Sequence, residues 1–219
     1  MITAVALHLS DGTDLHWDFD FSAQGTMRVN RLSMTKIPQW MRLEYCQCPG
    51  CLLTPKKNPL CPVAEVLGKY AFDLAEYRSY ESVNVDVFLD TGDVVQLESI
   101  PLQTVVSELV RLAVFQYECP IGRAVKPAMS DLPPFPSNDE ILDAFARAFE
   151  PGLGADTVNL SEEQEIYLEA LHDLFGNLSV RLEHLGQGDA HLNGVVILHS
   201  LAVLFTLSAP ELISVVRGR

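Results

Sequence analysis

Two segments in the first half of the chain share a pattern that is typical of a β-hairpin. In each segment, two short runs of alternating apolar and polar residues flank a turn that contains Asp and Gly, which is a strong hairpin signal. The hairpins cover residues 2–21 and 83–99, with their turns at 10–13 and 90–93. Because each hairpin supplies two strands, the sequence predicts a four-stranded antiparallel sheet.

Most of the remaining sequence has the period of an α-helix. Apolar residues at helical spacing predict one helix over 62–77, opened by Pro62, and another after Pro101 that ends before Cys119. The chain beyond residue 137 is predicted to be helical throughout. The sequence therefore indicates an α+β protein in which an N-terminal antiparallel sheet of two hairpins, with helices, precedes a helical C-terminal part.

Capping residues place the helices of the C-terminal part. Ser161 and Gln164 form the pattern of a capping box at the start of a long amphipathic helix that is predicted to reach Leu185. Asp189 is predicted to cap the helix that follows, and Pro210 to begin a last short helix.

The 219 residues can bury a large core in one domain or in two packed lobes. Four prolines between residues 126 and 136 predict a rigid connector. We therefore expect an α+β domain with the cysteines at residues 1–125, a Pro-rich connector at 126–137 and a helical part packed on the first at 138–219.

The charge of the chain excludes two classes of partner. With 29 acidic and 15 basic residues, the net charge is −14, so clustered Lys and Arg for nucleic acid or an anionic membrane are lacking. The N-terminus has no basic region typical of a signal peptide. The most apolar stretch, Val195 to Leu207, is shorter than the ~20 residues of a membrane span, so it is predicted to be a buried core helix. We expect a cytoplasmic protein.

Five cysteines carry the strongest functional signal. Cys48-Pro49-Gly50-Cys51 is a C-x-x-C pair, a spacing that lets two thiolates converge on one tetrahedral ion. Cys61 and Cys119 are each followed by Pro at the edge of a predicted helix. We predict that Cys48, Cys51, Cys61 and Cys119 are metal ligands, and that Cys46 is either a substitute ligand or a free thiol.

The ion is less well defined than its ligands. Four sulfur ligands suit Zn²⁺ at ~2.3 Å, but all-thiolate sites also hold iron–sulfur clusters, and unligated thiols are a third alternative. A dithiol redox centre is a fourth, although Pro55 argues against the helix that would follow a redox C-P-x-C motif. A zinc site closed by four sulfurs is structural, because it leaves no open position for a substrate.

No sequence motif indicates a reaction: G-x-S-x-G, the phosphate-binding loop, G-x-G-x-x-G and H-E-x-x-H do not occur. We therefore expect a non-catalytic binding or regulatory module that acts on an unidentified protein partner. The alternative is a redox or metal sensor with an iron–sulfur cluster or titrating thiols, in which Cys46 is the exchangeable group. The apolar face around 195–205 also predicts a possible homodimer.

Several segments together resemble a family of uncharacterised bacterial proteins classified as a domain of unknown function. The shared segments are CQCPGCLL (46–53), CPVAEVLGKY (61–70), SYESVNVDVF (79–88), LQTVVSELVRLAVFQYECP (102–120), KP followed by PPF (126–135) and GDAHLNGVVIL (188–198). The resemblance implies that Cys48, Cys51, Cys61 and Cys119 are the shared thiols, that Cys46 is particular to this chain and that the protein is bacterial and cytoplasmic. Tyr117-Glu118 stands where the family has Ser-Gly, and a histidine-containing loop of the family is replaced by Leu132 to Phe135. The resemblance to this family implies no reaction.

Overall fold

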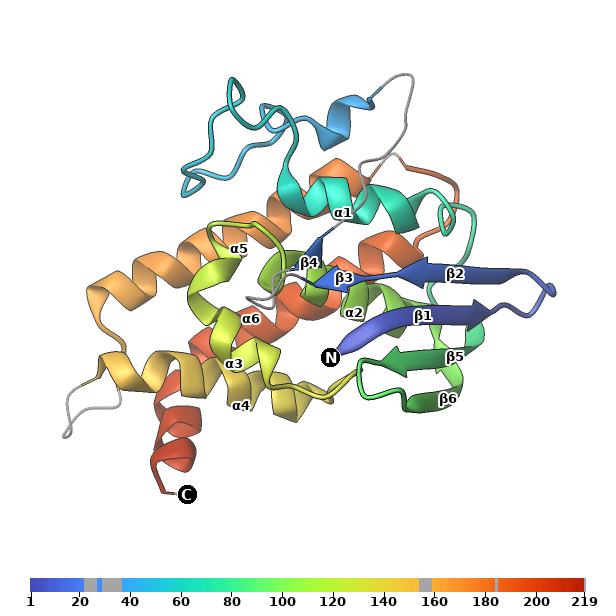
Figure 1. Ribbon diagram of the computed structural model, residues 1–219. Helices are drawn as coiled ribbons and strands as arrows, with labels where there is room; N and C mark the ends of the chain where they lie inside the picture. The colour runs from blue at the N-terminus through green and yellow to red at the C-terminus, as the bar shows by residue number, and fades with distance from the viewer. Residues whose placement is uncertain (22–26, 29–36, 154–158, 184, 219) are drawn as a thin grey trace.

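A computed structural model describes residues 1–21, 27–28, 37–153, 159–183 and 185–218 (Figure 1). Four strands form one antiparallel sheet in the order β2-β1-β5-β6. This confirms the predicted sheet of two hairpins. The strands are β1 (Ile2–His8), β2 (Asp14–Asp18), β5 (Ser82–Leu89) and β6 (Val94–Pro101), and a separate two-stranded ribbon pairs β3 (Asp20–Phe21) with β4 (Met27–Arg28).

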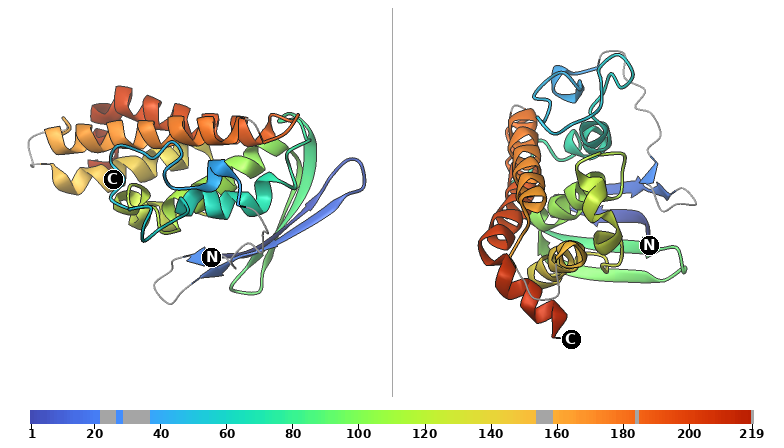
Figure 2. Two further views of the ribbon diagram at one scale, coloured as in Figure 1. Left: turned by 90° about the horizontal axis from the view of Figure 1, so that it is seen from above. Right: turned by 90° about the vertical axis from the view of Figure 1, so that its left-hand side faces the viewer.

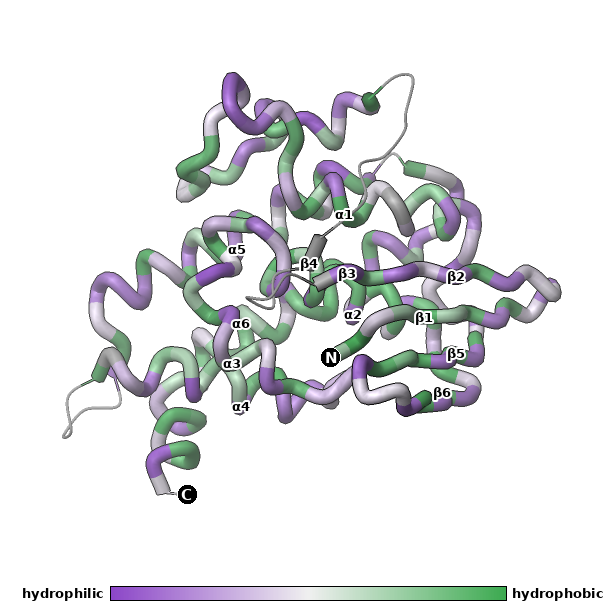
Figure 3. Tube along the Cα trace, viewed as in Figure 1, coloured by the Kyte–Doolittle hydropathy of each residue, from purple (hydrophilic) through white to green (hydrophobic). Residues whose placement is uncertain are grey.

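Both hairpin turns need glycine, because Gly12 and Gly92 have a φ of +87°, a conformation that costs other residues energy. Alternation along the two central strands then places one face of the sheet against the helices. Buried residues of this face are Val5 and Leu7 on β1 and Val85 and Val87 on β5. The trace of β1 is largely hydrophobic, whereas β2 carries more hydrophilic residues (Figure 3).

The helices cover one side of this sheet. In Figure 2, α1 and α2 lie next to the sheet, and α5 and α6 lie on the side away from it. This agrees with the predicted α+β class. The helices are α1 (Pro62–Ala71), α2 (Leu102–Phe115), α3 (Lys126–Ser130), α4 (Asn138–Phe149), α5 (Glu162–Leu182) and α6 (Ala190–Arg217), with short 3₁₀ helices η1 (Gln39–Met41), η2 (Gly122–Val125) and η3 (Glu150–Gly152).

A network of aromatic rings joins α2 to the C-terminal helices. Phe115 of α2 lies 6.2 Å from Phe145 of α4 and 6.5 Å from Phe175 of α5, measured between ring centroids. Phe145 in turn stacks on Phe205 of α6 at 5.5 Å. These residues belong to one hydrophobic cluster that also contains the buried sheet residues. Residues of the predicted parts 1–125 and 138–219 thus belong to one hydrophobic cluster, and the division of the chain into these parts stays a prediction.

Two segments differ from the sequence prediction. The helix predicted over 62–77 ends at Ala71, and turns follow in which Asp73 accepts a hydrogen bond from Trp17 (3.0 Å) and Tyr77 donates one to Asp11 (3.0 Å). The segment after Ala71 therefore contacts the first hairpin and does not continue the helix, although its apolar residues have helical spacing. The Pro-rich connector begins with helix α3, whose first turn tolerates a proline, and its Met129 is fully buried. The first part of the connector is therefore packed against the core.

The capping box at Ser161 and Gln164 is confirmed, and an unpredicted one, formed by Ser137 and Glu140, begins α4. Asp189 is the N-cap residue of α6, as predicted, but its side chain does not cap the helix. The carboxylate accepts hydrogen bonds from the backbone N–H (2.7 Å) and hydroxyl (3.2 Å) of Ser79 and from the side-chain amide of Asn193 in α6 (3.1 Å). Asp189 thus ties the start of α6 to a turn that is distant in sequence.

This tie predicts a pH-dependent contribution to stability. The backbone N–H of Ser79, the largest influence, lowers the pKa of Asp189, so the carboxylate stabilises the folded state above its ordinary pKa near 3.8 and loses this effect as the pH falls through the lowered value. Asp189→Ala should lower the free energy of unfolding by about 1 kcal/mol at pH 7. Urea unfolding at pH 7 and at pH 3 measures it: the difference from wild type should shrink at pH 3. Asp189→Asn, which keeps an acceptor, is the control, and a difference independent of pH would contradict the prediction.

Helix α6 contains the most apolar part of the chain. By length and composition alone it could cross a membrane, a test that core helices of soluble proteins also pass, and 39% of its most apolar window is buried. A buried core helix was predicted for 195–207; Val195, Leu198 and Phe205 are buried, but Leu207 is 76% exposed. The prediction is thus correct for the inner face only. A kink at Ser208 agrees with the break predicted near Pro210.

Candidate functional site

The four cysteines that the sequence groups together line one small cavity. The cavity has a volume of about 20 Å³, and its described lining includes Cys48, Cys51, Cys61 and Cys119. Cys48 and Cys51 come from the loop between β4 and α1, Cys61 from the start of α1 and Cys119 from the turn after α2. Two turns of α5 close the cavity with Leu174, Asn177, Leu178 and Arg181.

Tight turns position the first two cysteines. The backbone N–H of Cys51 donates to the carbonyl of Cys48 (3.0 Å), which closes the C-x-x-C turn. Gly50 lies against α5, where an added Cβ would approach the Cβ of Ala170 to 3.2 Å. The Gln47 amide donates to the carbonyl of Leu53 (2.9 Å) and so braces the loop on both sides of the pair. The pair is held by local bonds and by packing on α5.

The other two cysteines lie at helix ends. Cys61 is the residue before α1, and its own backbone N–H donates to the carbonyl of Met41 (2.9 Å). The N–H groups of Ile121 and Gly122 donate to the sulfur of Cys119. Gly122 is required there, since a Cβ would lie 2.0 Å from the carbonyl oxygen of Val114 in α2. The two N–H groups at Cys119 favour its thiolate form, against the effect of burial.

Burial opposes deprotonation of the thiols. The pKa of Cys48 is raised to about 11, mainly by burial and to a smaller extent by the neighbouring Cys61 and Cys51, while a hydrogen bond with Asn177 and the charge of Arg181 act in the opposite direction. Burial raises the pKa of Cys119 to about 12, against the N–H groups of Gly122 and Ile121, and with smaller contributions from Cys61 and Cys48. The mutual influence of these thiols shows that they occupy one electrostatic environment.

Cys46 does not belong to the described lining of the cavity. It is half-buried and has a φ of +48°, which is uncommon for a residue with a Cβ. Its carbonyl oxygen contacts the site, since it accepts a hydrogen bond from Arg181 (3.3 Å). The structure thus brings four of the five cysteines together and leaves Cys46 apart.

Sequence reasoning missed Arg181. This side chain is 3% exposed, lines the cavity and donates hydrogen bonds to the carbonyls of Arg42 (2.8 Å) and Leu43 (3.2 Å) in the cysteine loop. An arginine in an amphipathic helix is ordinarily solvated, so the residue type gave no signal. Its place on the inner face of α5, three residues after Leu178, could have drawn attention to it.

The thiols do not form a preorganised metal site. Over the described ranges of the chain, no three His, Cys, Asp or Glu side chains are grouped closely enough to hold a metal ion as they stand. All five cysteines are free thiols. The structure therefore supplies a cavity lined by four soft donors, which would have to turn toward one another to coordinate an ion.

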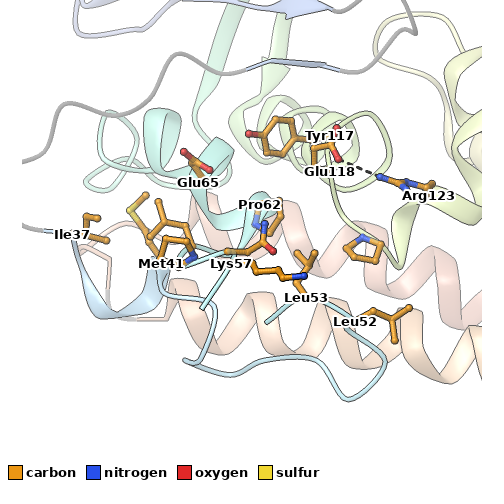
Figure 4. Close-up of a pocket in the computed structure, with 14 residues that line it drawn as sticks. Ile37, Met41, Leu52, Leu53, Lys57, Pro62, Glu65, Tyr117, Glu118 and Arg123 are labelled. Carbon is orange, nitrogen blue, oxygen red and sulfur yellow. Dashed lines mark hydrogen bonds and ion pairs between the residues drawn. The ribbon is translucent and has the colours of Figure 1, made fainter. Parts of the chain in front are cut away.

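A larger open cavity adjoins the cysteine cavity. It has a volume of about 690 Å³ and shares Pro62 and Pro120 with the smaller one (Figure 4). One wall is the loop that follows Cys51, and the other carries the ion pair between Glu118 and Arg123 (3.2 Å). Each wall is thus next in sequence to one of the four cysteines that line the smaller cavity: one wall follows Cys51 and the other lies on either side of Cys119.

Comparison with known proteins identifies the family. No curated protein and no solved structure matches the chain. The sequence model of one family, described as a domain of unknown function (DUF6901), matches residues 4–218 and therefore includes the whole cysteine site. The chain thus belongs to the DUF6901 family, a domain of unknown function.

Proposed function

We propose that the protein binds one Zn²⁺ ion through Cys48, Cys51, Cys61 and Cys119, and that this ion is a structural part of a cytoplasmic binding or regulatory module. The observation that carries the proposal is the shared cavity: four thiols from three separate segments line a space of about 20 Å³. Thiolate sulfur is a preferred ligand of Zn²⁺, and four such ligands complete its tetrahedral shell.

The size of the cavity favours a single ion. A space of about 10–15 Å³ holds one water molecule, so the cavity accommodates one atom of similar size but not the several iron and sulfide atoms of a cluster. This supports zinc over the iron–sulfur alternative. Binding would draw the four side chains inward, a movement that side-chain rotation at the tight turns permits.

The raised pKa values do not oppose this function. A bound divalent ion is the largest local charge and deprotonates a coordinating thiol outright. The high pKa values of Cys48 and Cys119 keep these thiols protonated, and therefore poorly nucleophilic, until an ion arrives. The same property argues against Cys48 or Cys119 as the reactive thiol of a redox sensor, since reactive cysteines have low pKa values.

A structural role follows from where the ligands lie. In the described residues between 37 and 61, the only regular elements are η1 and an isolated bridge between Arg42 and Leu60. A metal that joins this loop to the turn after α2 would stabilise the loop, which has few regular backbone hydrogen bonds of its own. It would also fix both walls of the larger cavity, which is the surface best placed to receive a partner (Figure 4).

Elemental analysis and the visible spectrum of protein purified without oxygen test the proposal. We expect about one zinc per chain and no visible colour, and we expect Co²⁺ to replace Zn²⁺ with the intense visible absorption of tetrahedral cobalt thiolates. A brown protein with several irons per chain would overturn the zinc proposal and support the iron–sulfur alternative. A metal-free protein that fails to take up Zn²⁺ or Co²⁺ would overturn both.

A further inference from the structure

Among the residues whose burial the structure describes, two arginines are buried, and they have different partners. Arg111 and Arg181 are each 3% exposed. Arg111 makes a two-pronged ion pair with Glu108, with both N–O distances at 2.7 Å. Arg181 donates only to carbonyl oxygens, those of Trp40, Arg42, Leu43 and Cys46. Among the residues that the structure describes, no carboxylate lies within ion-pair distance of Arg181.

The carbonyl oxygens accept hydrogen bonds from both terminal nitrogens of Arg181 but do not neutralise its charge. A buried ion without an opposite charge costs several kcal/mol, which is why buried charges are paired or lie next to metal centres. The Tyr45 ring, 6.0 Å from the guanidinium carbon, offers a weak cation–π contact and no net charge. The cysteines are the only groups in the described lining of the cavity that can become negative.

We infer that Arg181 is the counter-charge of the metal–thiolate centre, a positioning residue that makes a doubly negative tetrathiolate tolerable inside the protein. This inference rests on the proposed function. Four thiolates around a divalent ion leave two negative charges, and the guanidinium compensates one of them. The same guanidinium fixes the loop carbonyls between Trp40 and Cys46, so the charge is held at the cavity by bonds that an ammonium group could make only in part.

The test separates the charge of Arg181 from its hydrogen bonds. Zinc affinity is measured by competition with a chromophoric chelator for wild type, Arg181→Lys, Arg181→Gln and Arg111→Gln. We expect Arg181→Gln to weaken affinity at least about tenfold, the size of effect typical for groups behind metal ligands, and Arg181→Lys to weaken it much less. Arg111→Gln should lower the melting temperature without changing the affinity. An equal loss of zinc affinity in Arg181→Lys and Arg181→Gln would contradict the inference, because it would mean that Arg181 acts only through its hydrogen bonds to the loop carbonyls.

A second pair of variants covers the case in which Arg181→Gln does not fold. Asn177 lies one helical turn before Arg181, lines the same cavity and is only half-buried. Asn177→Lys adds a cation there, and Asn177→Leu removes the same hydrogen bond to Cys48 without adding charge. We expect the Lys variant to bind Zn²⁺ several-fold more tightly than the Leu variant. Equal affinities would overturn the inference alone, whereas a wild type that binds no metal would overturn the proposed function with it.

Discussion

Cys61→Ser and Cys51→Ser are each expected to lower the melting temperature by ~8–16 °C and to give largely insoluble protein. Serine keeps the size of the side chain but binds zinc poorly, so the variants lose the metal and little packing. A ligand present at 1,000 times its dissociation constant stabilises a protein by about 4 kcal/mol, and 1 kcal/mol shifts the melting temperature of a protein of this size by about 2–4 °C. Thermal unfolding followed by circular dichroism measures the shift.

Cys46→Ser is the matched control for these variants. Its thiol lies outside the described lining of the cavity and its backbone makes the contact with Arg181, which serine preserves. We expect a change in melting temperature of no more than about 2 °C. A strong chelator should bring wild type and Cys46→Ser down to the melting temperature of Cys61→Ser. Equal stability of all three variants would show that no structural metal is bound through these ligands.

The sheet could be predicted because its signals are local. The turns around Gly12 and Gly92 fix both hairpins, and the pairing of β1 with β5 follows from the need to bury one face of four strands. The end of α1 could not be predicted, because Leu74 and Tyr77 have helical spacing but are held by turns and by contacts with residues of the first hairpin. The position of Asp189 at the start of α6 is predicted correctly, but the bond of its side chain is not, because its partner, Ser79, is 110 residues away.

The candidate site was predictable as a set of residue types. The C-x-x-C spacing and the Cys-Pro pairs identify the four thiols that share the cavity, since cysteines at such turns are rarely incidental. The groups that act on these thiols are not visible in the pattern. The N–H groups of Ile121 and Gly122, the amide of Asn177 and the charge of Arg181 depend on how α2 and α5 pack, which no short motif encodes.

Glu108→Gln is expected to lower the free energy of unfolding by about 3–5 kcal/mol. The change keeps the shape of the side chain but leaves Arg111 as a buried, uncompensated charge, and removal of one partner of a buried pair has a cost of this size. Urea unfolding followed by fluorescence measures it. A cost below about 1 kcal/mol would mean that the carbonyl of Met129, which also accepts from Arg111 (2.9 Å), suffices to hold the guanidinium.

The double variant Glu108→Leu with Arg111→Met is the control, because replacement of a buried pair by apolar residues is often neutral or stabilising. It should recover most of the stability that Glu108→Gln loses. Glu108→Gln also reproduces at Arg111 the condition that Arg181 has when the cysteines are neutral: a buried guanidinium bonded to neutral oxygen atoms only. If Arg181 is the counter-charge of a metal centre, loss of the zinc leaves its guanidinium as an uncompensated buried charge. The cost of Glu108→Gln then approximates the electrostatic part of the free energy of unfolding that the protein loses with its zinc.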